Sequence, residues 1–169
     1  MRNPWQVIPN TGVGGTAPTP HTILMSLEPN TERFSEQLEV EFCATLAHEL
    51  HHTMRYQNPG AMKNLADALV WEGLAQHFEM EFRNTQTPPY ATLENPSRMN
   101  ELLELAKTDF DAPLDYTGWF FGIESRSIPF WCGYALGFEI MKRYFERTNQ
   151  TAATAWNVPT QTVFATLEA

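Results

Sequence analysis

The feature that most constrains this chain is the stretch Thr45–Arg55, TLAHELHHTMR, which contains the pattern His-Glu-x-x-His as His48, Glu49 and His52. In an α-helix, residues four apart lie on one face, about 6 Å apart along the axis. Two imidazoles at this spacing can bind a single metal ion, and zinc favours such ligands. Glu49 could accept a proton from a water molecule that the metal activates. The stretch therefore predicts a helix that carries a zinc site.

A catalytic zinc ion needs a third protein ligand and leaves one position open. His51 is the nearest candidate, but it points about 100° away from His52 around the helix axis, and it is expected at the surface or beside a ligand. Cys43 falls among apolar residues and is expected to point into the core, and His77 is a further candidate. All three are weaker candidates than an acidic residue on the next predicted helix.

Glu72 is that residue, in the segment Val70–Ala75. Its carboxylate could reach the histidines if a second helix packs against the first, and the break at Asn58–Gly60 turns the chain back. Gly73 would let the two helices approach closely. The neighbours of Glu72 are apolar, so burial of its charge would be costly without a cation beside it. The sequence thus predicts zinc held by Glu72 and the two histidines.

The remaining pattern predicts a mostly helical chain with little β-structure. Residues 1–20 are rich in Pro and Gly and are expected to form a loop, with at most a short strand at Trp5–Ile8. Within them, Gly12–Gly15 is either a flexible linker or a loop that frames a substrate cleft. One strand is expected at His21–Leu27, and Phe110–Pro129 is expected to be irregular. Helices are expected from Asn30 or Thr31 to Arg55, at Ala61–Arg83, at Pro96–Lys107 and at Phe130–Arg147, with a short one in Thr151–Ala169.

Length and charge restrict the class of protein. With 169 residues, the chain is most simply one domain, residues 1–169, and nothing in it sets an oligomeric state. Its formal charge of -9 argues against nucleic acid as a partner, because phosphate binding needs a basic surface. It has no run of about 18 apolar residues that could span a membrane and no signal-peptide core, so a cytoplasmic location is expected. Cys43 and Cys132 are both expected to be buried packing residues.

Four segments together resemble a family of small bacterial predicted zinc-dependent proteases, which is catalogued as a domain of unknown function. They are Gly12–Gly15, His48–Arg55, Glu72–Ala75 and Trp131–Gly137. The histidine motif, followed by a glutamate after 19 intervening residues, also resembles the gluzincins, the thermolysin-type metallopeptidases. The resemblance covers roughly residues 11–147. It implies an α+β, mostly α, zincin-like fold of four to five helices with a small or truncated amino-terminal sheet.

The resemblance implies roles for the residues of the motif. His48, His52 and Glu72 would bind zinc, and Glu49 would act as the general base. Gluzincins often carry an acid four residues after the glutamate ligand, where it orients a histidine, but this chain has Gln76 at that position.

The resemblance also implies how a substrate is held. A peptide would pair its backbone along an edge strand at Thr22–Leu27, and Tyr134 would bring a phenol near the developing oxyanion. From its residues alone, Tyr134 could equally be a core residue of its helix. Arg126, in the loop before that helix, could instead supply a cation to the oxyanion. Arg55 is expected to cap its own helix, because basic residues suit the last turn.

Together these features predict a zinc metallopeptidase that acts on a peptide or protein substrate. The open cleft expected of so small a domain favours an endopeptidase. Zn2+ and Glu49 would activate the attacking water. An alternative is a catalytically inactive relative that binds zinc or a peptide. A third reading is a helical interaction module without a metal, and the zinc content of the purified protein separates this reading from the other two.

Overall fold

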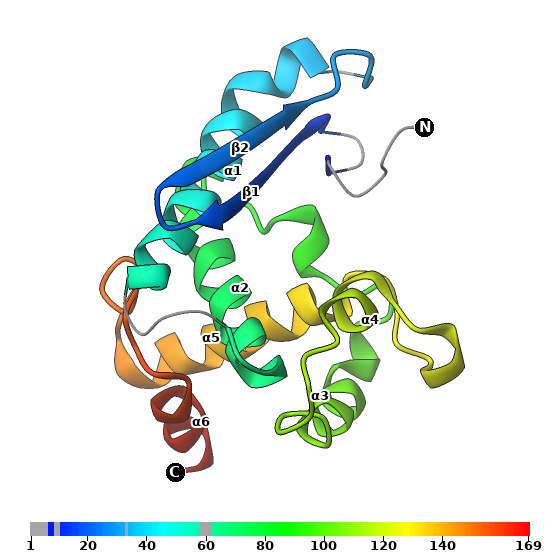
Figure 1. Cartoon of the computed structure of the whole chain (residues 1–169), viewed down its shortest axis with the longest axis vertical. Coiled ribbons are helices and arrows are strands. Elements are labelled where there is room, and N and C mark those ends of the chain that lie inside the picture. The colour runs from blue at the N-terminus through cyan, green and yellow to red at the C-terminus, as the bar shows by residue number, and fades with distance from the viewer. Residues whose placement is uncertain (1–6, 9–10, 33, 58–61) are drawn as a thin grey trace.

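The computed structural model describes residues 7–8, 11–32, 34–57 and 62–169. Within these residues, the chain forms a two-stranded sheet and six α-helices (Figure 1). The elements are β1 (Val13–Thr19), β2 (Thr22–Leu27), α1 (Phe34–Gln57), α2 (Leu65–Met80), α3 (Met99–Lys107), α4 (Tyr116–Phe121), α5 (Cys132–Thr148) and α6 (Thr160–Glu168). The predicted class, mostly helical with a small sheet, is confirmed, with six helices where four to five were expected.

β1 and β2 form an antiparallel hairpin that packs on α1 (Figure 1). The register pairs Val13 with Leu27 and Gly15 with Met25. The prediction of β2 is confirmed, whereas the loop predicted for residues 1–20 is wrong over β1. Gly and Pro disfavour a strand locally, but β2 supplies partners for the backbone of β1, and Val13 is fully buried.

The two helices that carry the candidate ligands follow each other as predicted. α1 begins at Phe34, slightly later than expected. α2 begins at Leu65, where the side chain of Asn64 caps the helix by accepting a hydrogen bond from the backbone N–H of Asp67. The expected break at Asn58–Gly60 lies outside the described residues.

The later helices agree with the sequence except in one segment. α3, α5 and α6 confirm the three helices predicted after position 96. Phe110–Pro129, expected to be irregular, contains α4. Of the short strand expected at Trp5–Ile8, residues 5 and 6 lie outside the described residues, and Val7 and Ile8 are not in a strand. No helix in the described part of the chain has the length and apolarity needed to cross a membrane.

α2 and α5 touch through two glycines. A Cβ atom at Gly73 would lie 2.1 Å from the carbonyl oxygen of Gly137, and a Cβ atom at Gly137 would lie 2.4 Å from the carbonyl oxygen of Leu69. Real Cβ atoms do not approach backbone so closely, so this crossing requires glycine at both positions. The sequence predicts that Gly73 lets α2 approach α1, but the structure places it against α5. Glu72, beside it in sequence, faces α1.

Arg55 ties the end of α1 to the carboxyl-terminal tail. Its guanidinium donates hydrogen bonds to the carbonyl oxygens of Trp156 at 2.7 Å and Val158 at 3.3 Å, and it lies 5.5 Å from the ring centroid of Trp71. Burial lowers the pKa of Arg55 to about 10, which leaves it charged at neutral pH. The prediction that Arg55 caps its own helix is therefore wrong, because its partners come from the far end of the chain.

His51 joins α1 to the same tail. Its Nε2 atom lies 3.3 Å from the carbonyl oxygen of Ala152, and its ring lies against Phe78 with centroids 5.7 Å apart. Burial lowers the pKa of His51 to about 3, so the imidazole is neutral at physiological pH. Of the two positions expected for His51, at the surface or beside a ligand, the surface position is wrong, because His51 is almost completely buried.

The two cysteines differ in environment. Cys132 is fully buried, as predicted, and burial raises the pKa of its thiol to about 12. Cys43 is exposed on α1, so its prediction as a packing residue is wrong. Apolar neighbours in the sequence did not decide its burial, because the next residues along a helix point in other directions around its axis.

Candidate metal centre

Three buried side chains from α1 and α2 meet at one point. Nε2 of His48 lies 3.2 Å from Oε2 of Glu72, and Nε2 of His52 lies 3.5 Å from the same oxygen. One ligand atom from each residue lies within 4.8 Å of the other two. Ligand atoms about 2.0–2.1 Å from a tetrahedral zinc ion are about 3.3 Å from one another. The donor set and its spacing therefore fit three of the four positions around zinc.

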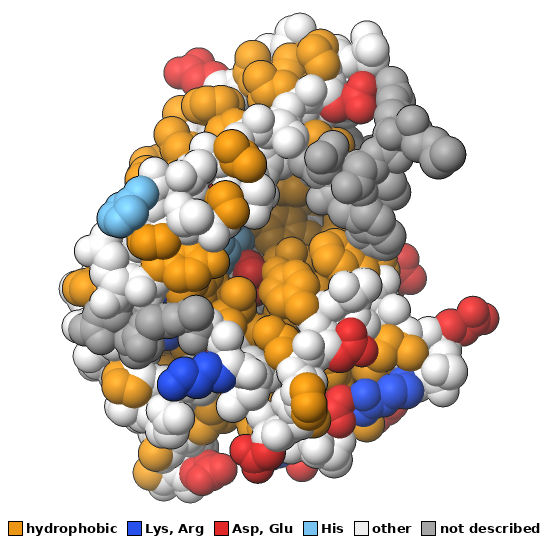
Figure 2. All heavy atoms as spheres, viewed as in Figure 1, with side chains coloured by type: hydrophobic (Ala, Val, Ile, Leu, Met, Phe, Trp, Pro, Cys, Tyr) orange, Lys and Arg blue, Asp and Glu red, His pale blue; other side chains and the backbone are white. Residues whose placement is uncertain are grey.

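The two helices explain this arrangement. His48 and His52 stand four residues apart on α1, and their rings meet edge to face with centroids 4.6 Å apart. Glu72 comes from α2, which packs against α1. Figure 2 shows a hollow between the hairpin and the helices, with hydrophobic walls and with histidine and acidic side chains at its floor. A buried charged cluster at the floor of an apolar hollow is typical of a binding or catalytic site.

The electrostatics of the three residues favour a cation. Burial by itself would raise the pKa of Glu72 and lower that of His48. The imidazoles of His52 and His48 outweigh burial and hold the pKa of Glu72 well below its ordinary value. Hydrogen bonds to Glu72 and Glu79 raise the pKa of His48 well above its ordinary value. The carboxylates thus stabilise positive charge at this point. A divalent cation bound by neutral imidazoles would supply that positive charge in place of a proton.

Glu49 lies beside the three candidate ligands. It is buried, and its Oε2 atom has no hydrogen-bond partner among the described residues. Burial raises its pKa, while the charges of His52 and His48 act in the opposite direction. A Cβ atom at Gly15 would lie 2.6 Å from Cγ of Glu49, so the bare backbone of β1 packs directly on this side chain. Gly15, the last residue of the glycine segment, therefore borders the site as part of β1.

Glu79 contacts His48 at Nδ1, the ring nitrogen that does not face Glu72. The sequence analysis did not identify this residue. Nδ1 of His48 lies 3.0 Å from Oε2 of Glu79, and the hydroxyl of Tyr90 donates to the same oxygen. Oε1 of Glu79 accepts a hydrogen bond from Nε of Arg83 at 2.6 Å, and Arg83 donates in turn to Glu41 at 2.6 Å. Burial would raise the pKa of Glu79, but these partners lower it, so Glu79 is ionised. A carboxylate in this position fixes the tautomer and direction of a ligating histidine.

Gluzincins often carry the acid that orients a histidine at the position that corresponds to residue 76, and the sequence already showed glutamine there. Gln76 stands there and is fully buried, without a hydrogen-bond partner among the described residues. The spacing of Glu79 from Glu72 is a signal that could have identified it, because residues seven apart share one face of a helix.

Two tyrosine hydroxyls lie on the other side of Glu72. Tyr116 donates a hydrogen bond to Oε1 of Glu72 at 2.8 Å, and the hydroxyl of Tyr134 lies 3.2 Å from that of Tyr116. Burial raises the pKa of both tyrosines, and the Glu72 charge adds to this effect, so both keep their protons. For Tyr134, the sequence left two positions open, near the site or in the core of its helix. Tyr116 was missed because its segment shows no helical periodicity.

A family model described as "Predicted Zn-dependent protease (DUF2268)" matches residues 2–165. The chain belongs to this family. The resemblance noted from the sequence motifs is thereby confirmed at the level of the family.

A curated relative of this chain is described as an uncharacterized protein. The chain is 28% identical over 127 residues to "Uncharacterized protein YjaZ" of Bacillus subtilis (strain 168). The match covers 70% of this chain and 48% of the relative, so the chain spans about half the length of the curated relative it matches. No solved structure matches the chain.

Other candidate residues of this chain have different partners. Arg126 pairs with Asp109 at 2.6 Å and lies over the ring of Trp119, 5.5 Å from its centroid. Nε2 of His77 lies 2.9 Å from the carbonyl oxygen of Phe138, and the two rings stack. The structure thus gathers Tyr134 with the candidate ligands, whereas these contacts hold Arg126 and His77 elsewhere.

A Glu79→Gln substitution tests whether Glu79 supports the metal site. We expect the affinity for zinc to fall about 10- to 100-fold, because the amide keeps the shape but removes the charge that orients His48. Competition with a chromophoric chelator measures this affinity. Glu81→Gln is a matched control, because Glu81 is exposed and lies two residues further on. Wild-type affinity in Glu79→Gln would show that Glu79 has no part in metal binding.

Proposed function

We propose that this protein is a zinc-dependent metallopeptidase of the gluzincin type that hydrolyses peptide bonds in a peptide or protein substrate. The observation that carries the proposal is the convergence of His48, His52 and Glu72 at spacings that suit zinc. The position of Glu49 supports it further, since this buried carboxylate lies close enough to interact with the charges of both histidines. The description of the family as predicted Zn-dependent proteases agrees with the proposal.

In the proposed reaction, zinc held by the three ligands would polarise the peptide carbonyl and lower the pKa of water to about 7. Glu49 takes a proton from the attacking water on Oε2, the oxygen without a hydrogen-bond partner among the described residues. The oxygen of this water bonds to the carbonyl carbon. As the carbon–nitrogen bond breaks, Glu49 gives the proton to the leaving amine. Burial raises the pKa of Glu49, which suits a group that must both take and return a proton near neutral pH.

We assign the stabilisation of the oxyanion to Tyr134. Its hydroxyl is one hydrogen bond away from Tyr116 and two from the candidate ligand Glu72, and burial keeps it protonated. A donor placed where negative charge develops stabilises the transition state more strongly in a buried site than in water. Arg126 was the other candidate, and its ion pair with Asp109 favours Tyr134 over it.

We assign the binding of the peptide backbone to β1. β2 occupies one edge of β1, and among the described residues no other strand pairs with the opposite edge. Gly15 lies on β1 against Glu49, so a peptide that paired with this edge would pass close to the proposed base. The sequence predicted this role for Thr22–Leu27, and the contact with Glu49 is the reason to transfer it to β1.

A peptide-library digestion with and without a zinc chelator tests the proposed function. We expect cleavage by protein that contains about one zinc ion per chain, loss of at least about 100-fold in rate with the chelator, and recovery when zinc is restored. Mass spectrometry of the products and elemental analysis measure both quantities. Bound zinc without any cleavage would favour an inactive relative. Absence of stoichiometric zinc would favour an interaction module.

A further inference from the structure

The two oxygens of Glu72 have different partners. Oε2 faces both imidazoles, at 3.2 Å from Nε2 of His48 and 3.5 Å from Nε2 of His52. Oε1 instead accepts a hydrogen bond from the hydroxyl of Tyr116 at 2.8 Å. One oxygen of the carboxylate is therefore presented to the histidines, while the other is engaged by a neighbouring helix.

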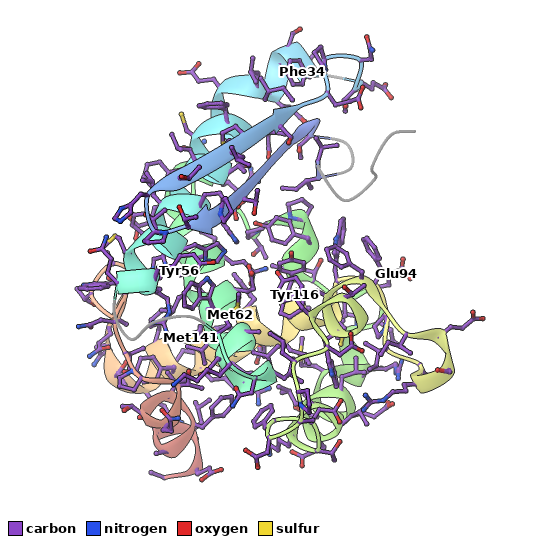
Figure 3. All side chains as sticks on the ribbon, viewed as in Figure 1. Phe34, Tyr56, Met62, Glu94, Tyr116 and Met141 are labelled. Carbon is purple, nitrogen blue, oxygen red and sulfur yellow. The ribbon has the colours of Figure 1, made fainter. Side chains whose placement is uncertain are left out.

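Tyr116 is held firmly in this position. It is the first residue of α4, and Figure 3 shows it between α4 and α2. Its ring stacks on that of Phe120 with centroids 4.1 Å apart and an angle of 9° between the planes. The side chain of Asp115 caps the helix by accepting a hydrogen bond from the backbone N–H of Gly118 at 2.8 Å. The direction of the phenol is thus set by packing as well as by the bond to Glu72.

The carboxylate also sets the direction of the next hydrogen bond. An ionised carboxylate can only accept a hydrogen bond, and the hydroxyl of Tyr116 is the donor in its 2.8 Å bond to Oε1 of Glu72. The single proton of the Tyr116 hydroxyl is therefore committed to Glu72. In the 3.2 Å contact between the two phenols, Tyr134 must then donate to the oxygen of Tyr116. Of the two phenols, Tyr134 is therefore the one whose proton can leave this bond for another acceptor without breaking the bond to Glu72.

We propose that Tyr116 is a positioning residue that restricts Glu72 to binding metal through one oxygen. This inference rests on the proposed function, because it concerns the same metal ligands. With Oε1 engaged by Tyr116, Glu72 offers zinc only Oε2, and the position that a second carboxylate oxygen would take is left to the reactants. Tyr116 also keeps Tyr134 beside the metal site with its proton available.

Tyr116→Phe tests this inference, with Tyr144→Phe as the matched control. The substitution keeps the ring on Phe120 and removes only the hydroxyl. Tyr144 is a buried tyrosine on α5, and its hydroxyl donates to Gln150 rather than to a candidate ligand. We expect the zinc affinity of Tyr116→Phe, measured by chelator competition, to fall about 10- to 100-fold, and that of Tyr144→Phe to stay at the wild-type value.

A second measurement reports the coordination itself. With Co2+ in place of zinc, a four-coordinate site absorbs visible light more strongly than a five- or six-coordinate one, because geometry governs these bands. We expect the Co2+ form of Tyr116→Phe to absorb more weakly than the wild type, since a freed Oε1 can bind the metal as well. Tyr134→Phe should keep the wild-type spectrum and affinity while kcat falls about 10²- to 10³-fold, because it removes only the oxyanion donor.

The outcomes separate this inference from the proposed function. Wild-type zinc affinity and an unchanged Co2+ spectrum in Tyr116→Phe would overturn the role of Tyr116, even in an active peptidase. An equal loss of affinity in Tyr144→Phe would also overturn it, because the loss would then reflect general stability. A wild-type protein that binds zinc but cleaves no peptide would overturn only the proposed function. A wild-type protein that binds no zinc would overturn both.

Discussion

Glu49→Gln is expected to lower kcat for peptide hydrolysis by about 10²- to 10⁴-fold while the protein still binds one zinc ion. Glutamine has nearly the same shape as glutamate, but its amide cannot take the proton of the attacking water. Zinc should be retained because the candidate ligands are His48, His52 and Glu72. Steady-state kinetics on a peptide identified from the library and elemental analysis of the same sample give the two quantities.

Glu39→Gln is the matched control for this experiment. Glu39 lies on α1 as well, but it is exposed, so its loss should leave both kcat and zinc content unchanged. If Glu49→Gln hydrolysed peptides at the wild-type rate, Glu49 could not be the general base. If it instead lost zinc together with activity, Glu49 would be part of the metal site rather than the group that moves the proton.

Gly73→Ala is expected to lower the free energy of unfolding by about 2 kcal/mol or more. Alanine is favoured over glycine in a helix by about 1 kcal/mol, so local propensity alone predicts stabilisation. The new Cβ atom would, however, lie 2.1 Å from the carbonyl oxygen of Gly137, in the backbone of α5. Overpacking costs typically about 1–3 kcal/mol and occasionally more, and we expect at least about 3 kcal/mol here, because a helix backbone cannot move aside as a side chain can. This cost exceeds the gain in helix propensity by about 2 kcal/mol or more.

Thermal denaturation measures the effect of Gly73→Ala, and we expect the Tm to fall by about 4–8 °C. Zinc affinity should fall as well, because Glu72 is the adjacent residue. Gly133→Ala is the comparison, since the three atoms nearest to a Cβ atom there belong to the ring of Phe120, at 2.8 Å, and a side chain can move aside, so this change should cost less. A Gly73→Ala protein as stable as the wild type would mean that α2 and α5 do not cross at this distance.

Local spacing was sufficient to predict the centre of the site. His48 and His52 fall on one face of α1 because any helix places residues four apart together. Glu72 was identified by its apolar neighbours and by its place on the following helix, and the structure brings its Oε2 atom next to both histidines. The family was identified from the same residues, since its motifs are local in sequence.

Local spacing was not sufficient where a residue depends on a partner from another element. The sequence predicted a loop at β1 because glycine and proline disfavour a strand. The segment forms a strand because its backbone pairs with β2. The sequence predicted that Arg55 caps its own helix, but its guanidinium donates to the carbonyl oxygens of Trp156 and Val158. Gly73 correctly suggested a close helix contact, but the sequence could not tell which helix would be close.

The amino-acid sequence by itself therefore determined the family, the mostly helical class and the three candidate metal ligands. The tertiary structure alone decided what surrounds them: Glu79 behind His48, Tyr116 on Glu72 and Gly15 against Glu49. The physical reason is that sequence patterns relate residues that are close along the chain, whereas tertiary contacts join residues that are far apart along it. Periodicity relates residues within one helix, whereas the bonds from Glu79 and Tyr116 join residues 31 and 44 positions apart, which meet only when the helices pack.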